Sequence, residues 1–540
     1  MKKKMMALVL VAAMALSMMA CGNSKESKSN EESVSTETDV AEQTTEEQGT
    51  TEKQEEIQRG GTLVIGFEGA IANLGYPGLV SGSNEINLVL PVVETLCRYD
   101  ESAELVPWLA ESYETDADAL TLTVTLKQGI KFHDGTDFNG EAVKWNWETF
   151  MEEGRTEIAS IESIECPDEY TVVAHLSQWD NTIADNALYV AGLMFSPTYC
   201  QSVDKDTATT HPVGTGAYKF VNWEQDVKLT YEANQDYWIE GKPYMDGIEI
   251  QFVADTNTIS TSYLSGELDL MPAMTSDLIM IMASSGEESV ASDSLLGGSG
   301  INMIVYGCND ESSPTSNLLV RQAIAYAIDW ETICNSLQGM FYTNQWAIPG
   351  AWSYNENVKG YPYNPDEAKK LLEEAGYADG CSISCYVVEA GVPGVTMMQQ
   401  YLSKVGITLN IEVIDQARTN EMTGIGGGWD GMMYTTGRMD VETASIYERT
   451  FTDDGVRFVG ATLHPSELVE AISNAKAAKT EEERNKDTQE ASRIIIDDYC
   501  MISPVGVATY ELYEKEYVHN SGYLKGHLVL WTPEECWLSK

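Results

Sequence analysis

The sequence predicts an α/β protein with mixed sheets, divided between more than one lobe. The chain has 540 residues, which is more than one hydrophobic core usually serves. Hydrophobic residues make up 43% of it, so most of the chain can fold around buried cores. Segments with the two-residue period of a strand alternate with segments of helical period. Such alternation favours helices packed on sheets in discontinuous lobes.

The first half of the folded region begins with a short apolar strand at residues 60–67. The strongest alternation lies at residues 119–133, and a helix is expected over residues 140–151. The alternating segment predicts a half-buried strand with one apolar face, made of Leu120, Leu122, Val124 and Leu126.

The second half alternates helix and strand. Asn364 and Pro365 are suited to the N-cap and first position of a helix that ends before Gly376. We expect further helices over residues 319–337, 395–405 and 479–497, and strands over residues 381–389 and 407–414.

The N-terminus predicts export. Residues 2–4 are lysines and residues 5–20 are an apolar run, shorter than the roughly 20 residues of a spanning helix. Cys21 follows Ala20 directly, so the segment resembles a lipoprotein signal, in which this cysteine becomes the lipidated N-terminus. The alternative is an ordinary secretion signal with an incidental cysteine. The lipoprotein interpretation places the protein on the extracellular face of the cytoplasmic membrane, attached by its lipid.

Composition excludes several classes of function. With 84 acidic and 33 basic residues, the formal charge is -51, which repels nucleic acid. The sequence has no signature of a metalloprotease, a phosphate-binding loop or a serine hydrolase. His133 precedes an Asp-Gly turn and is interpreted as stabilising that turn, and the glycine-rich residues 424–428 are interpreted as a loop. We therefore predict no enzyme and no cofactor.

Cysteine spacing gives no metal site. Nine cysteines follow Cys21, and an odd number cannot all pair within the chain. Cys381 and Cys385 lie four apart without a second pair of ligands nearby, so we predict no metal there. Most of these thiols are expected to be buried as small hydrophobic groups.

Four long segments, in order, resemble the peptide/nickel class of ABC-transporter solute-binding proteins, family 5. They are residues 94–148, 211–270, 320–333 and 361–380. The resemblance implies an α/β, two-lobed periplasmic-binding-protein-like fold (type II, cluster C) with an additional third domain. The boundaries it implies are a signal at 1–20, a disordered acidic tether at 21–59, lobe I at 61–84, 206–300 and 505–540, domain II at 85–205, and lobe III at 301–504.

The resemblance also implies a mode of action. The lobes would close on a di- or oligopeptide by a hinge motion, and the monomeric protein would then deliver it to ABC permease and ATPase subunits. Relatives hold the peptide as an added strand and pair its ammonium with an aspartate. Asp440 is the best match for that aspartate, although the flanking aromatic residues of the family pattern are missing. Arg438 could bind a carboxylate or pair with Asp440.

Other candidate ligand contacts come from segments that line the cleft in relatives or from aromatic character. They are Glu68, Gly69, Ala70, Trp346, Tyr434, Thr435 and Gly437. Three alternatives stay open: the same role for an oligosaccharide, metal chelate or modified peptide, a peptide-sensing receptor, and a lipid-anchored enzyme.

Overall fold

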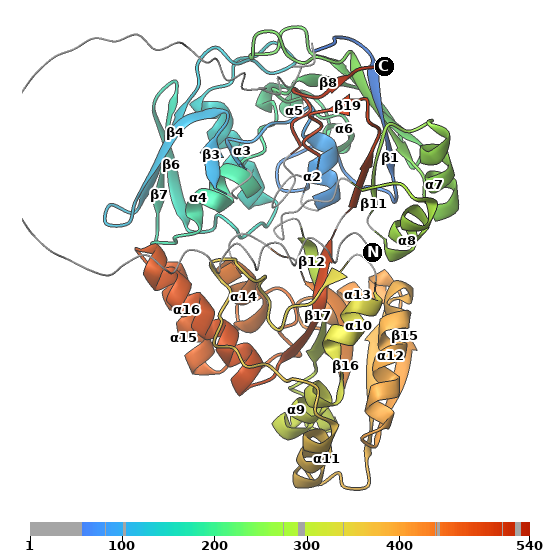
Figure 1. Ribbon diagram of the computed structural model, residues 1–540. Coiled ribbons are helices and arrows are strands. Elements are labelled where there is room, and N and C mark those ends of the chain that lie inside the picture. Colours follow the sequence, from blue (N-terminus) through green and yellow to red (C-terminus); the bar gives the residue numbers. More distant parts are fainter. Residues whose placement is uncertain are drawn as a thin grey trace, which may run out of the picture. The chain divides into compact units, whose positions relative to one another are not determined.

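The computed structural model describes residues 57–80, 83–100, 104–273, 275–289, 298–337, 340–437, 439, 443–509, 511–523 and 531–540. Residues 57–540 form one compact unit. It contains two six-stranded mixed sheets and smaller sheets, with helices packed on them (Figure 1). The predicted Cys21 lies outside the described residues.

Lobe I is built on the first six-stranded sheet, in which β1 lies between two parallel neighbours. In spatial order its strands are β18 (Glu511–Glu514), β11 (Leu270–Ala273), β1 (Thr62–Phe67), β10 (Gly247–Phe252), β9 (Lys228–Ala233) and β8 (Tyr218–Glu224). Helices α2 (Ser83–Val89) and α5 (Pro197–Ser202) contribute to the core of this sheet, although most of α2 and all of α5 fall in the range expected for domain II. The other helices are α6 (Lys205–Thr210), α7 (Thr256–Ser265) and α8 (Ser276–Ser285), and a short pair, β19 (Val518–His519) and β20 (Trp537–Leu538), follows β18.

Domain II has its own hydrophobic core under a four-stranded antiparallel sheet. Leu122, Val124 and Leu126, on one face of the alternating segment predicted at residues 119–133, are fully buried, which confirms the alternation. Leu120 lies just before the strand. The strands are β2 (Cys97–Tyr99), β3 (Leu105–Pro107), β4 (Ala110–Asp116), β5 (Thr121–Leu126), β6 (Ile161–Asp168) and β7 (Thr171–Leu176), with helices α3 (Gly140–Glu152), α4 (Ile183–Asp185) and η1 (Asn186–Val190).

Lobe III is built on the second six-stranded sheet and the largest hydrophobic core. Its strands, in spatial order, are β13 (Met340–Phe341), β17 (Ile502–Thr509), β12 (Gly298–Tyr306), β16 (Met432–Gly437), β14 (Cys381–Val387) and β15 (Ile407–Val413). Its helices are η2 (Pro314–Ser316), α9 (Leu318–Ala327), α10 (Trp330–Ser336), α11 (Pro365–Glu374), η3 (Glu389–Gly391), α12 (Val392–Ser403), α13 (Gln416–Thr423), α14 (Thr443–Phe451), α15 (Ser466–Ala477), α16 (Glu481–Arg493) and η4 (Ile494–Asp498).

One helix predicted in lobe III is wrong as a single element. The segment 319–337 forms α9 and α10, which are separated at Ile328 and Asp329. The Asp329 side chain accepts a hydrogen bond from the Thr332 N–H and caps α10, so a new helix begins where apolar periodicity alone suggested continuation. At α11 the predicted cap is confirmed, because Asn364 accepts from the Glu367 N–H.

His133 bonds a distant loop, whereas the Asp-Gly turn that follows it is closed by the Gly135 N–H and the Phe132 carbonyl oxygen. The His133 Nε2 donates to the Gly216 carbonyl oxygen at 2.8 Å, and its backbone N–H donates to the Gly214 carbonyl oxygen. A side chain at Gly214 would put Cβ 2.2 Å from the Val92 carbonyl oxygen. Gly214 and Gly216 therefore allow this loop to approach the backbone at Val92 closely.

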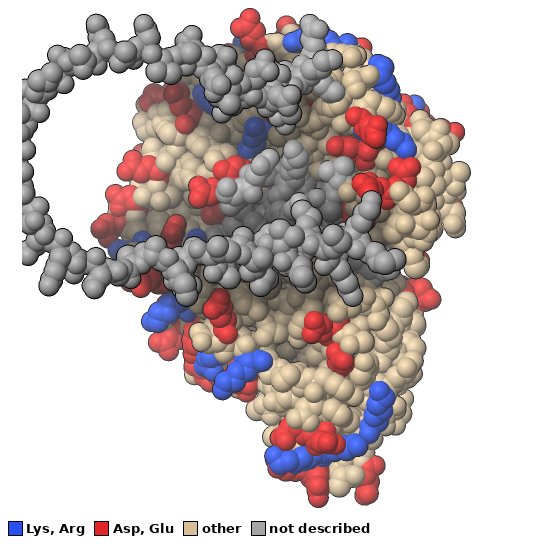
Figure 2. Space-filling view, in the orientation of Figure 1, with Lys and Arg blue, Asp and Glu red and all other residues tan. Residues whose placement is uncertain are grey.

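Seven of the nine cysteines after Cys21 are buried, as expected for small hydrophobic groups, and none of the nine forms a disulfide in the described structure. Among the described residues, no helix is both long and apolar enough to cross a membrane. Figure 2 shows acidic side chains spread over the visible face, with fewer basic ones.

Candidate functional site

The two large sheets turn their carboxyl edges toward the same crossing point. β17 ends at Thr509, paired with Gly298, and β18 begins two residues later at Glu511, paired with Ala273 at the end of β11. In Figure 1 β17 runs from the second sheet toward β11. Ligands of open α/β sheets bind outside the carboxyl ends of strands, so residues after β1 and β16 form the candidate site.

The lobe I edge carries three predicted residues in the loop after β1. Glu68 accepts hydrogen bonds from the hydroxyls of Thr256 at 3.0 Å and Thr275 at 2.9 Å, the residues that open α7 and α8. Gly69 has φ of +128°, a conformation that favours glycine, and Ala70 is exposed. The structure thus brings Glu68, Gly69 and Ala70 to the carboxyl edge, with Glu68 already held by its own lobe.

The lobe III edge carries the predicted residues of β16. Thr435 and Gly437 are buried and pair with Met303 and Ile301 of β12. A Cβ at Gly437 would lie 2.4 Å from the Trp346 ring, so only glycine lets the indole pack there. The end of β16 therefore depends on close packing against lobe III.

The two predicted aromatic contacts are packed into lobe III. Trp346 is 4% exposed and meets Tyr447 and Phe451 edge to face. Tyr434 covers Gly391, and burial raises the pKa of its phenol. Both side chains shape the strand that carries the edge, and direct contact with a solute stays a prediction. Arg438 and Asp440 lie outside the described residues.

Sequence reasoning missed two arginines at this edge. Arg457 donates from Nη2 to the Thr436 carbonyl oxygen at 3.0 Å. Arg449 lies in the last turn of α14, and its carbonyl oxygen accepts a hydrogen bond from the Arg457 backbone N–H. No local motif marks either residue. A guanidinium reaching the end of β16 was not foreseeable, because α14 and β16 are brought together only by packing.

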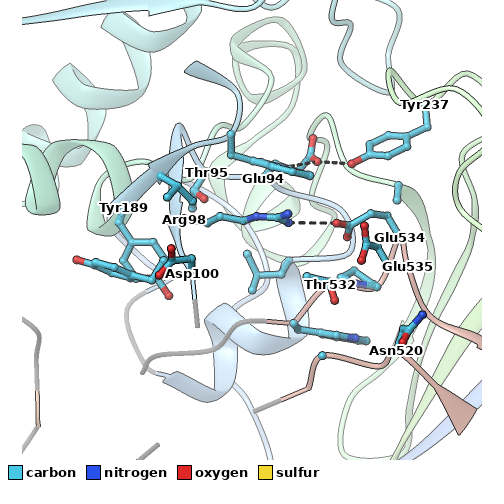
Figure 3. Close-up of a pocket in the computed structure, with 18 residues that line it drawn as sticks. Glu94, Thr95, Arg98, Asp100, Tyr189, Tyr237, Asn520, Thr532, Glu534 and Glu535 are labelled. Carbon is cyan, nitrogen blue, oxygen red and sulfur yellow. Dashed lines mark hydrogen bonds and ion pairs between the residues drawn. The ribbon is translucent and has the colours of Figure 1, made fainter. Parts of the chain in front are cut away.

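A pocket of about 370 Å³ lies between domain II and the C-terminal segment of the chain (Figure 3). Arg98 extends through it to Glu534, with 3.1 Å between Nη1 and Oε1, and its guanidinium lies 3.3 Å from the Trp108 ring centroid. Figure 3 shows Tyr189 and Asp100 at the end away from Asn520. Aromatic walls with a central ion pair suit an organic group with polar ends.

Glu94 anchors the wall of this pocket. Its carboxylate accepts from the indole nitrogens of Trp108 and Trp238 and from the hydroxyls of Tyr237 and Thr215, at 2.7 to 3.0 Å. Burial raises the pKa of Glu94, and the four donors act in the opposite direction. Because all four donors converge on one buried carboxylate, Glu94 joins domain II to lobe I, and its role is structural.

Comparison with known proteins assigns the family. The model for bacterial extracellular solute-binding proteins, family 5, middle region, matches residues 104–457. The chain belongs to this family. The family predicted from the sequence is thereby confirmed, and the matched region runs from domain II through most of lobe III.

Family 5 relatives include the glutathione-binding protein GsiB of Pectobacterium atrosepticum, 30% identical over 342 residues, which are 61% of this chain and 65% of the relative. GsiB of Salmonella typhi is 30% identical over 350 residues, which are 63% of this chain and 67% of the relative.

Solved structures confirm the two-lobed fold. DppA from Helicobacter pylori, in complex with peptide STSA, has a TM-score of 0.75 at 22% identity, covering 89% of this chain and 99% of that one. AppA from Bacillus subtilis, in complex with a nonapeptide, has a TM-score of 0.74 at 20% identity, covering 90% and 100%. NikZ from Campylobacter jejuni, in complex with Ni(L-His), has a TM-score of 0.73 at 19% identity, covering 88% and 97%.

Proposed function

We propose that this family 5 protein is the extracytoplasmic solute-binding subunit of an ABC importer and that it captures short peptides. The observation that carries the proposal is the meeting of two carboxyl edges at a crossing made of few chain segments. Such a crossing can act as a hinge, and closure would surround a solute between the loop after β1 and the end of β16. The closed form would then be recognised by separate permease subunits.

The edge of β16 supports a peptide ligand. β16 pairs with β12 along its whole length, but with β14 only at Met432 and Met433. The described structure gives Thr435 to Gly437 no strand partner on the β14 side. An extended peptide could add there as a strand, which is how many proteins bind peptides of varied sequence. Similarity to glutathione-binding and peptide-bound relatives favours the same class of ligand.

Native mass spectrometry of the purified protein, with residues 1–56 removed, tests this proposal. We expect bound masses that identify a ladder of short peptides. A single non-peptide mass, such as an oligosaccharide or a metal chelate, would retain solute capture and overturn the peptide ligand. Turnover of an added peptide would instead support the lipid-anchored enzyme.

Asp440 remains the proposed partner of the peptide ammonium. Replacing it with alanine should weaken binding of a captured peptide at least tenfold, about 1.4 kcal/mol. N-acetylation of the same peptide should weaken binding to the wild type and leave binding to Asp440→Ala unchanged. The exposed Asp206→Ala is a charge-matched control. Equal affinity of the wild type for free and acetylated peptide would remove this role.

The proposed lipid anchor is tested in cells. Cys21→Ser should move the protein from the membrane fraction to the medium or supernatant, because the thioether cannot form. Continued membrane association of Cys21→Ser would contradict lipidation. Growth on a captured peptide as the sole source of an amino acid, lost on deletion of the gene and restored by the wild type, would separate import from sensing.

A further inference from the structure

The pocket between domain II and the C-terminal segment is separate from the proposed solute site. Its lining comes mainly from residues 90–100, 106–108 and 531–535. Within the described part of the chain, none of the candidate contacts at the carboxyl edges of β1 and β16 lines it. Its volume of about 370 Å³ is enough for a small organic molecule. The pocket therefore offers a second place for a ligand.

Aromatic side chains form the walls of this pocket and are held in place by their own contacts. They are Tyr99, Trp108, Tyr189, Tyr237 and Trp531, and all except Trp108 are only 3% to 8% exposed. The Tyr99 hydroxyl donates to Asp185 at 2.5 Å, and the Tyr99 and Tyr189 rings pack with their centroids 4.8 Å apart. The Tyr237 hydroxyl is fixed by Glu94. Because the rings are already positioned, a ligand would bind without ordering them.

The lining carries more negative than positive charge. Four carboxylates and one guanidinium line the pocket, from Glu94, Asp100, Glu534, Glu535 and Arg98. Arg98 pairs with Glu534 inside the pocket, and Glu535 pairs with a lysine outside it. Glu94 and Asp100 therefore set the sign of the remaining charge, which favours a cation.

Glu94 leaves a buried negative charge beside the pocket. Each of its two oxygens accepts two hydrogen bonds from neutral donors, so the carboxylate stays ionised to keep all four. Among the described residues it forms no ion pair, and the ammonium of Lys127 bonds the Trp108 carbonyl oxygen instead. A buried charge is costly without a counter-charge, so Glu94 would stabilise a cation in the pocket.

The carboxylates have few acceptor positions left for N–H groups. Those of Glu94 are filled, Glu534 accepts from Arg98, and Asp100 accepts from the Glu104 N–H at 3.0 Å. A primary ammonium has three N–H donors that need acceptors, whereas a quaternary ammonium has none and is bound by aromatic faces. The pocket already holds one cation in this way, because the Arg98 guanidinium lies 3.3 Å from the Trp108 ring centroid.

We infer that this pocket binds a small organic cation of the quaternary ammonium class. Figure 3 shows Tyr189 and Asp100 together at one end of the pocket, where the cationic head would meet a ring and a carboxylate. A polar group at the other end of the molecule would reach the donors of Arg98. The inference does not depend on a peptide ligand, because the pocket and the proposed solute site share no described residue.

Calorimetric titration of the purified protein with choline tests the inference, at constant ionic strength balanced with sodium chloride. Choline should bind one saturable site at least about tenfold more tightly than ethanolamine, its primary ammonium counterpart, or neohexanol, its neutral carbon isostere. No saturable binding of choline, or equal binding of the three compounds, would overturn the inference. Displacement of choline by a captured peptide would place the cation in the cleft and would also overturn it.

Two substitutions locate the cation within the pocket. Tyr189→Leu removes a ring, and Asp100→Asn removes a charge while keeping the shape, so each should weaken choline binding at least about fivefold. The exposed Tyr363→Leu and Asp206→Asn are the matched controls and should keep wild-type affinity. Thermal unfolding checks that each variant is folded, and Asp100→Asn decides the matter if Tyr189→Leu is not. Wild-type affinity for choline in a folded pocket variant would contradict this placement.

Discussion

Asn181 of domain II donates its backbone N–H to the carbonyl oxygen of Lys476, near the end of α15 in lobe III, at 2.9 Å. Its side chain donates to the Ala475 carbonyl oxygen, and the Trp179 indole donates to the Ala478 carbonyl oxygen. The last carbonyls of a helix have no partners within it. Domain II therefore caps a helix of lobe III, and this contact favours the arrangement in which domain II and lobe III touch.

Removing this cap should weaken solute binding without touching the solute. Asn181→Ala deletes the side-chain hydrogen bond to Ala475. We therefore expect the form in which domain II and lobe III touch to lose about 1 kcal/mol of stability, and the Kd for the solute to rise several-fold. Calorimetry with a captured peptide measures it. Asn222→Ala on the exposed part of β8 is the matched control. An unchanged Kd for Asn181→Ala would show that the contact persists in both forms.

Protonation of His133 should make the protein less stable in acid. Burial lowers the pKa of His133 from 6.5 to about 4. Between these values the unfolded chain binds a proton that the folded protein does not, so stability is complete above pH 6.5 and falls as the pH falls. At pH 5 the loss is about 2 kcal/mol. His133→Gln, which keeps a donor for Gly216, should lose correspondingly less between pH 7.5 and 5.0 in urea unfolding. Equal losses would contradict this assignment.

Arg321 should tolerate lysine poorly although the charge is kept. The side chain is 1% exposed and donates to the carbonyl oxygens of Tyr499, Cys500, Thr315 and Ser316. One ammonium cannot reach both sets of carbonyls, so Arg321→Lys should lower the free energy of unfolding by about 2–4 kcal/mol. The exposed Arg418→Lys should change it by less than about 0.5 kcal/mol. Similar values for both variants in denaturant titrations would refute this account.

Gly437→Ala should disturb the end of β16. The new methyl group would lie 2.4 Å from Met303 Cε and from the Trp346 ring, so side chains must move at a cost of about 1–3 kcal/mol. Solute affinity should fall as well, because the edge moves with the strand. Thr436→Ser keeps the hydroxyl bond to Asn302 and serves as the neighbouring control. Wild-type stability and affinity of Gly437→Ala would contradict this prediction, because they would show that the Trp346 ring can move aside without cost.

Local patterns were sufficient where the decisive interaction is local. The cap at Asn364 and the alternating face of β5 are each set within a few residues, and the structure confirms them. The break between α9 and α10 was missed, because apolar periodicity continued through the residues that contain the Asp329 cap. The Asp329 cap starts a new helix there, although the apolar periodicity continues across the break.

Placement of the candidate contacts needed the tertiary structure. Trp346 and Tyr434 have aromatic character that suits either a ligand or a core, and only packing shows them inside lobe III. The opposite holds for Arg457, which has no distinguishing sequence context and lies at the edge of β16. Exposure of a side chain depends on segments far away in the chain, so periodicity cannot supply it.

The sequence by itself determined the α/β class, the family and most helices and strands, since these follow from periodicity, capping and long matching segments. The tertiary structure decided which residues share a site. Glu157 of domain II and Arg449 of α14 lie 3.6 Å apart, and charges so far apart in the sequence interact only once folding brings them together. That distance dependence is why this ion pair could be found only in the folded protein.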